Sequence, residues 1–162
     1  MLGQGAMGTV YKAVDPLIER TVAIKTISLD LSKEERAEFE ERFYREAKSA
    51  GRLSHPNIVT IYDVGEVDDV AYIAMEYLEG KSLREMLDSG VVLPVDQISR
   101  IAARIASALN YAHENRVVHR DIKPANIMIL RNRDIKIMDF GIAHIPTGSR
   151  TQVGTVLGSP KY

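Results

Sequence analysis

A charged loop between two apolar segments is the feature that most constrains this 162-residue chain. The stretch HRDIKPAN, residues 119–126, stands between an apolar pair at 117–118 and an apolar run over 127–130. Flanks of this kind draw a segment toward a core, where a charge needs either a partner or a chemical role. Asp121, Lys123 and Asn126 bring an acid, a cation and an amide into this one loop. We therefore predict that the loop carries catalytic side chains.

Hydrophobic periodicity predicts a strand-rich first part and a helix-rich second part. Strands are expected over 10–14, 21–29, 58–64 and 70–75. Between the second and third of these strands, a capping box of Ser32 and Glu35 opens a helix. Its predicted apolar stripe, Phe39, Phe43, Ala50 and Leu53, also contains Glu46. After a connector at 76–80, a second capping box of Ser82 and Glu85 opens a helix expected over 82–90. A longer helix is expected over 96–115, and strands over 127–130 and 135–138. The inward face of the longer helix is predicted to contain Ile98, Ile101, Ala102, Ile105, Leu109 and Ala112.

Composition excludes several classes of protein. The formal net charge is -1, whereas a nucleic-acid-binding domain normally shows a clear basic excess. The chain has no cysteine, which excludes disulfides and cysteine-based zinc sites and fits a reducing, cytoplasmic setting. No apolar run is long enough to span a membrane.

A glycine-rich segment and a lysine on the following strands point to phosphate binding. GQGAMGTV, residues 3–10, has the spacing G-x-G-x-x-G-x-V, which lets the backbone approach a phosphate; a plain hairpin turn is the alternative. A strand follows the glycines, so a dinucleotide fold is excluded, since there the glycines open a helix. Lys25 is the expected partner of Glu46, because a carboxylate in an apolar stripe is costly without a cation. The alternatives are a surface lysine and a solvated glutamate.

The triplet Asp139-Phe140-Gly141 follows the last predicted strand. The carboxylate of Asp139 provides hard oxygen atoms, which are the ligands that Mg²⁺ prefers. Alone, this triplet reads as a β-turn, and His119-Arg120-Asp121 alone reads as a salt-bridged loop. Together with the glycines and Lys25 they predict phosphoryl transfer.

The motifs GxGxxGxV, VAIK, HRDxKPxN and DFG occur in the order and spacing of eukaryotic-type protein kinases, which this chain resembles over essentially its whole length. The stretches LGQGAMGTVYKAVD and HRDIKPANIMI most resemble bacterial serine/threonine kinases of this type. The resemblance implies an α+β, two-lobed fold. Residues 1–75 would form a small β-rich lobe with one main helix, 76–80 a hinge, and 81–162 the first part of a helical lobe.

The resemblance also implies roles for individual residues. Asp121 would orient and deprotonate the substrate hydroxyl, Lys123 would neutralise the γ-phosphate, and Lys25, held by Glu46, would bind the α- and β-phosphates. Asn126 and Asp139 would hold Mg²⁺, with Mn²⁺ as an alternative ion. The remaining ATP-binding residues would be Leu2, Gly3, Gly5, Gly8, Val10, Ala23, Met75, Glu76, Leu78 and Met128, with Glu76 and Leu78 acting through their backbones.

The segment after Asp139 resembles an activation loop. Thr151, and next Thr155, are the predicted phosphorylation sites, with Arg120 as the partner of the phosphate. Ordinary loop threonines are the alternative. Ser159 matches a position that usually touches the catalytic loop.

The implied activity is transfer of the γ-phosphate of ATP to serine and threonine hydroxyls of proteins, including autophosphorylation. The chain stops before an Ala-Pro-Glu-like motif, so we expect a truncated domain that is unstable and inactive by itself. A homodimer for autoactivation and a membrane anchor in the parent protein are further expectations from the resemblance. The alternatives are a pseudokinase scaffold and, less favoured, an aminoglycoside-type phosphotransferase.

Overall fold

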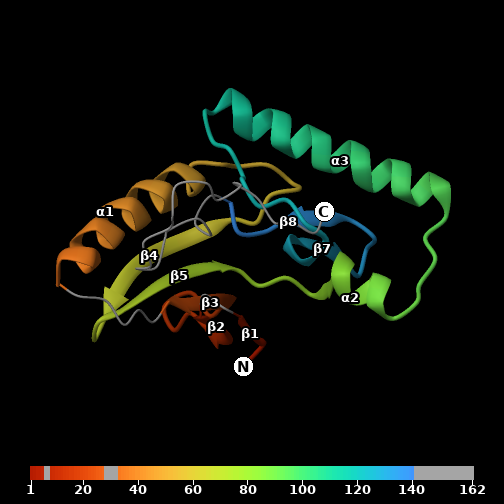
Figure 1. Cartoon of the computed structure of the whole chain (residues 1–162). Coiled ribbons are helices and arrows are strands. Elements are labelled where there is room, and N and C mark those ends of the chain that lie inside the picture. Colours follow the sequence, from red (N-terminus) through yellow and green to blue (C-terminus); the bar gives the residue numbers. More distant parts are fainter. Residues whose placement is uncertain (6–7, 28–32, 141–162) are drawn as a thin grey trace. The chain divides into compact units, whose positions relative to one another are not determined.

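The computed structural model describes residues 1–5, 8–27 and 33–140, which form two compact units (Figure 1). Within the described part, the first unit contains residues 1–52 and 60–77, and the second contains 53–59 and 78–140. None of the helices in these ranges is both long and apolar enough to cross a membrane.

The first unit is an antiparallel sheet with one helix. The strand order is β1-β2-β3-β5-β4, with bounds β1 Gly3–Gly5, β2 Gly8–Val14, β3 Thr21–Ile27, β4 Ile61–Val67 and β5 Val70–Glu76, and the helix is α1 Lys33–Ala50. Alternate residues of β5 are buried, as expected when one face of a strand meets a core: Ala71, Ile73 and Met75. Figure 1 shows α1 running beside β4.

The apolar face of α1 differs by one position from the predicted stripe. Phe39 and Phe43 are buried and their rings stack at 5.6 Å. Ala47 and Ala50 continue the buried face, whereas Glu46 is half-buried at its edge. This placement lowers the desolvation cost of the Glu46 carboxylate. The predicted capping box of Ser32 and Glu35 lies outside the residues and side chains that the structure describes.

The second unit is built on a three-stranded antiparallel sheet in the order β6-β7-β8. Its elements are β6 Gly80–Ser82, α2 Leu83–Asp88, α3 Val95–Glu114, the 3-10 helix η1 Pro124–Asn126, β7 Ile127–Leu130 and β8 Ile135–Ile137. Its core combines the sheet with one face of α3: Ile127, Ile129, Ile135, Ile137, Ile101, Ala108 and Ala112 are all buried.

Residues 53–59 belong to this second unit through bonds to β8. Val59 N–H donates to Ile137 O at 3.0 Å, and Ile137 N–H donates to Asn57 O at 2.9 Å. The buried Asn57 side chain also donates to Ile135 O at 2.8 Å. The predicted strand over 58–64 is therefore wrong at its start, because the backbone at 58–59 pairs with β8 and β4 begins only at Ile61.

Two further differences concern short strands and the face of α3. β1 and β6 were not predicted; each is three residues long and contains glycine, which weakens the periodic signal. On α3, Ile98 and Ala102 were expected to point inward but are exposed. The buried face instead uses Ala108, whose small side chain permits close packing.

The capping box that begins α2 is confirmed and yields a first stability prediction. Ser82 Oγ accepts from Glu85 N–H at 3.1 Å, and the Glu85 carboxylate accepts from Ser82 N–H at 2.7 Å. Replacing Ser82 by alanine should lower the free energy of unfolding by about 1 kcal/mol. Ser99→Ala is the control, since the Ser99 hydroxyl donates only to Val95 O within α3. Equal thermal shifts in both variants would contradict this role of the cap.

Candidate active site

Three polar side chains of the 119–126 loop, those of Asp121, Lys123 and Asn126, lie together in the second unit. Lys123 Nζ is 2.6 Å from Asp121 Oδ2, and the Asp121 side chain is only 11% exposed. Asn126 Nδ2 donates to Asp121 Oδ2 at 3.1 Å and to Asp121 O at 2.8 Å. The carboxylate is thus held between a cation and an amide donor, which fixes its direction.

The 3-10 turn sets the position of Asn126. Pro124 occupies the first position of η1, where the missing N–H of proline costs nothing, and Asn126 N–H closes the turn on Lys123 O at 2.9 Å. Asn126 itself is buried. Both hydrogen bonds of its side chain use Nδ2, so the amide oxygen is the group suited to a metal.

His119 connects this loop to the segment after β8. Its Nε2 lies 2.7 Å from Met138 O, and Met138 N–H donates to Asn126 O at 2.9 Å. The ring of Phe140 meets the imidazole edge-on at 4.6 Å. The backbone on either side of Asp139 is therefore held against the loop that carries Asp121 and Asn126.

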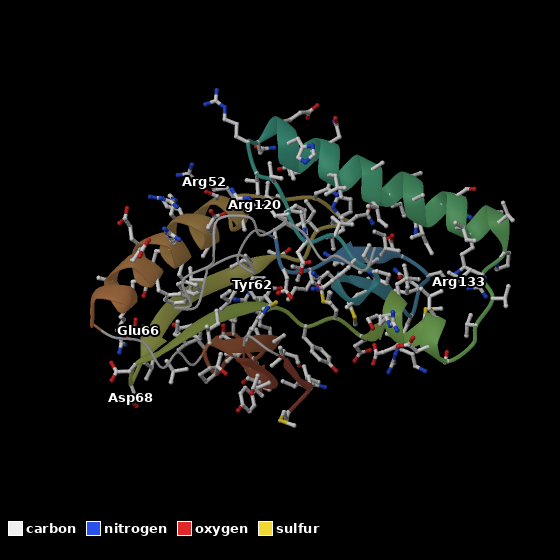
Figure 2. The ribbon with its side chains drawn as sticks, viewed as in Figure 1. Arg52, Tyr62, Glu66, Asp68, Arg120 and Arg133 are labelled. Atoms are coloured by element: carbon white, nitrogen blue, oxygen red, sulfur yellow. The ribbon has the colours of Figure 1, made fainter. Side chains whose placement is uncertain are left out.

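Both loops of the site contain a strained residue. Arg120 has φ 68° and Asp139 has φ 59°, in the left-handed region that side chains other than glycine seldom adopt. Figure 2 labels Arg120, which is exposed. Strain of this kind costs on the order of 1–3 kcal/mol, so the surrounding contacts must hold both residues in this conformation.

The donor set fits a magnesium ion that is shared with a phosphate ligand. Among the described residues, no three His, Cys, Asp or Glu side chains gather closely enough to hold a metal by themselves. Mg²⁺ in nucleotide sites is usually bound by one or two protein oxygen ligands together with phosphates and water. Asp139 and the amide oxygen of Asn126 offer oxygen atoms of this kind.

Burial of His119 predicts a pH-dependent stability. The side chain is 1% exposed, and this desolvation lowers the pKa of His119 below its usual 6.5, despite opposing effects of Met138 O, Asp139 and Asp121. Asp121 N–H donates to Nδ1 at 3.2 Å, so the neutral ring, protonated at Nε2, satisfies both contacts. Below pH 6.5 the unfolded chain takes up a proton at His119 that the folded chain does not, so the free energy of unfolding should fall as the pH decreases.

This pH prediction is tested by comparing the protein with a His119→Gln variant. Thermal unfolding measured between pH 7.5 and 5 should show a steeper loss of stability in the unsubstituted protein. Asp121, Asp139 and Lys123, the charged groups that act on His119, are present in both proteins, so their titration largely cancels in the difference. Parallel pH curves would refute this role of His119.

The glycine-rich segment forms an antiparallel hairpin from β1 and β2 in the first unit. Gly3 pairs with Val10, and Gly5 pairs with Gly8. Gly8 has φ +135°, and a Cβ built there would lie 1.7 Å from Thr26 O on β3. A Cβ on Gly3 would meet nothing within 4 Å. Of Gly3 and Gly8, the fold therefore requires glycine at position 8. The backbone at Gly3 has open space beside it.

The other predicted residues of the first unit gather on neighbouring strands. Lys25 lies on β3 in register with Val10 and is half-buried, and Ala23 on the same strand pairs with Met75. Ala23 and Met75 are buried. Glu76 follows at the end of β5, and its N–H donates to Thr60 O at 2.9 Å. The predicted ion pair between Lys25 and Glu46 stays a prediction.

The remaining predicted residues are dispersed along the chain. Leu2 is exposed and its N–H donates to Val10 O at 2.7 Å. Leu78 is half-buried in the second unit, and Met128 lies on β7 opposite Ser82. Thr151, Thr155 and Ser159 lie outside the described residues.

Sequence reasoning missed His119 and Asn57 as organisers of the site. Both are buried polar residues, and each holds backbone of the 134–138 region in the second unit. The available signal was that each stands beside apolar residues, where an uncharged polar side chain generally bonds to backbone.

Comparison with known proteins gives consistent matches over the whole chain. The family model described as "Protein kinase domain" matches residues 1–162. The chain is 46% identical to the probable serine/threonine-protein kinase SCO3848 of Streptomyces coelicolor over 169 residues, and 46% identical to the serine/threonine-protein kinase PrkC of Bacillus subtilis over 163 residues. All of this chain is covered in both cases, but it spans only 25% of the length of each relative.

Solved structures agree with these matches. The kinase domain of PknI from Mycobacterium tuberculosis superposes with a TM-score of 0.75 at 40% identity, covering 89% of this chain and 57% of that one. Rad53 residues 1–466, solved in complex with AMP-PNP, superposes with a TM-score of 0.75 at 31% identity, covering 87% of this chain and 36% of that one.

Proposed function

This chain belongs to the protein kinase family and has the protein kinase fold, and on that premise we propose that it carries the nucleotide-binding and catalytic part of a serine/threonine protein kinase. The proposed reaction moves the γ-phosphate of ATP to a serine or threonine hydroxyl of a protein, including sites on its own gene product. The observation that supports this best is the arrangement of Asp121 between Lys123 and Asn126.

Asp121 is proposed to orient the substrate hydroxyl and accept its proton. Its carboxylate is nearly buried and accepts a hydrogen bond from Asn126. These contacts fix the orientation in which it would accept a hydrogen bond from the substrate hydroxyl. Lys123, 2.6 Å away, supplies positive charge beside the position of the transferred phosphoryl group. In a loose transition state, positioning and charge neutralisation account for most of the catalysis.

Asn126 and Asp139 are proposed to hold Mg²⁺, which when bound neutralises charge on the phosphates. The bonds from His119 and Asn126 to the Met138 peptide keep Asp139 close to the loop that carries Asn126. Mn²⁺ has similar oxygen preferences and is the alternative ion to include in assays.

The other nucleotide contacts are proposed to come mainly from residues of the first unit, together with Leu78 and Met128 of the second. The open backbone at Gly3 and the hairpin to Gly8 would approach the phosphates, with Lys25 binding them and Glu46 directing Lys25. The proposed apolar surroundings of the adenine are Leu2, Val10, Ala23, Met75 and Met128. Because Glu76 N–H already donates to Thr60 O, we assign to the adenine edge the carbonyl of Glu76 and the backbone of Leu78.

We propose regulation by phosphorylation at Thr151 or Thr155, with Arg120 as the cation that binds the phosphate. Arg120 is exposed and adjacent to Asp121, so a phosphate bound there would act directly on the catalytic loop. Peptide mapping of the autophosphorylated gene product would identify the modified residue.

The proposed function is tested with the full-length gene product, labelled ATP, Mg²⁺ and a general protein substrate. Label on serine and threonine that depends on Asp121 supports a kinase. Nucleotide binding without transfer would instead support the pseudokinase alternative, and label on a small-molecule aminoglycoside would support the phosphotransferase alternative.

A further inference from the structure

A single arginine joins the start of α1 to the β4–β5 hairpin in the first unit. Arg36 Nε lies 3.0 Å from Glu40 on the same helix. Its NH2 group pairs with Glu66 at the end of β4 and lies 2.8 Å from Asp69 in the turn between β4 and β5. Figure 2 labels Glu66, which lies beside the first turns of α1. The guanidinium therefore connects the helix to a part of the sheet distant in sequence.

The pair of Arg36 and Glu66 is more enclosed than the pair of Arg42 and Glu38, which also involves an arginine of α1. In the first pair the side chains are 33% and 25% exposed, whereas Arg42 and its partner Glu38, both on α1, are 41% and 63% exposed. Exposed i,i+4 pairs contribute little, but networks of several charges in partly enclosed surroundings contribute more. Arg42 has the same chemistry and pairs with Glu38 inside α1, which makes it a matched control.

The space under Arg36 is too small for a ligand. Ile27, Phe39 and Ala71 form an apolar floor to a hollow of about 20 Å³. That volume holds roughly one water molecule. The contacts of the cluster are within the protein, where they link α1 to the β4–β5 hairpin.

The position of α1 matters because it carries Glu46. Arg36 and Glu46 are separated by about 15 Å along the axis, at a rise of about 1.5 Å per residue. Phe43, with 1% exposure, anchors the helix between them. A helix packed along one face can still rotate or tilt slightly, and a contact near its first turns restrains that motion and so restrains the Glu46 carboxylate.

We propose that Arg36 is a positioning residue, which through α1 holds Glu46 in the place where it directs Lys25. This inference rests on the proposed kinase function. Arg36 would touch neither nucleotide nor substrate, and its effect would be carried by the orientation of the helix.

The test compares Arg36→Ala, Arg36→Lys and Arg42→Ala in the full-length gene product, each with Glu46 intact and with Glu46→Gln. Arg36→Ala should lower kcat/KM for ATP about fivefold, a factor that is typical of a partly enclosed ion-pair network. Arg36→Lys should recover part of this loss, and Arg42→Ala should cause none. In the Glu46→Gln background, Arg36→Ala should have no further effect, because the group it positions is already changed.

A fivefold loss that persists in the Glu46→Gln background would overturn the proposal, as would a loss of thermal stability with kcat/KM unchanged. Hydrogen exchange of the α1 amides provides a readout that needs no activity: Arg36→Ala should speed exchange over residues 43–48 and Arg42→Ala should not. If the unsubstituted protein transfers no phosphate, the proposed function fails, and this exchange measurement still decides whether Arg36 holds the helix.

Discussion

Replacing Asp121 by asparagine is expected to lower kcat for phosphoryl transfer by about 10²- to 10⁴-fold, the range that general base catalysis usually contributes. Asparagine has the same shape as aspartate and can still accept a bond from Lys123 or Asn126. It has no carboxylate to accept a proton, and it removes the charge that faces Lys123 at 2.6 Å. Binding of Mg²⁺ and ATP should change much less than kcat, because Asp121 is not among the proposed ligands of either.

The measurement is the initial rate of labelled phosphate transfer, together with calorimetry of nucleotide binding. Asp88→Asn serves as a control, since Asp88 is 57% exposed on α2 and pairs with Arg84 in the same helix. Asp88→Asn should retain the rate of the unsubstituted protein. Retention of that rate by Asp121→Asn would remove Asp121 from the mechanism and with it the main support for the proposed function.

Replacing Gly8 by alanine is expected to lower the free energy of unfolding by about 2–6 kcal/mol, the sum of backbone strain and overpacking. The new Cβ would lie 1.7 Å from Thr26 O, and φ of +135° is unfavourable for any residue with a side chain. The clash is with backbone, so it cannot be relieved by a rotamer change. β2 must move away from β3 for the substitution to be accommodated.

Gly3→Ala separates this structural role from phosphate binding. Its Cβ would have no neighbour within 4 Å, so its thermal midpoint should be close to that of the unsubstituted protein. If Gly3 lies over the phosphates as proposed, Gly3→Ala should weaken ATP binding without loss of stability. Similar thermal midpoints for the two glycine variants would show that the contact of Gly8 with β3 does not limit stability.

Local sequence patterns predicted most helices and strands, because the formation of these elements depends largely on residues close together in the chain. Alternation located β3 and β5, and the capping box of Ser82 and Glu85 located the start of α2. The same patterns predicted strand bounds less well where backbone from a distant part of the chain takes the hydrogen bonds of a segment. Residues 58–59 have the composition of a strand in line with β4, but β8 takes their hydrogen bonds. The inward face of α3 also depends on what packs against it, which explains the exposure of Ile98.

In the candidate site, too, some features follow from local sequence and others from contacts between distant residues. The sequence by itself determined the chemistry, since an acid, an amide and a lysine in one loop are useful together whatever surrounds them, and their spacing indicated the protein kinase family. Only the tertiary structure decided that His119 holds the Met138 peptide, that Gly8 must lack a side chain because Thr26 O lies against it, and that Arg36 joins α1 to the β4–β5 hairpin. These are contacts between residues far apart in the chain, and their energies depend on distance and burial, which arise only when the chain has folded.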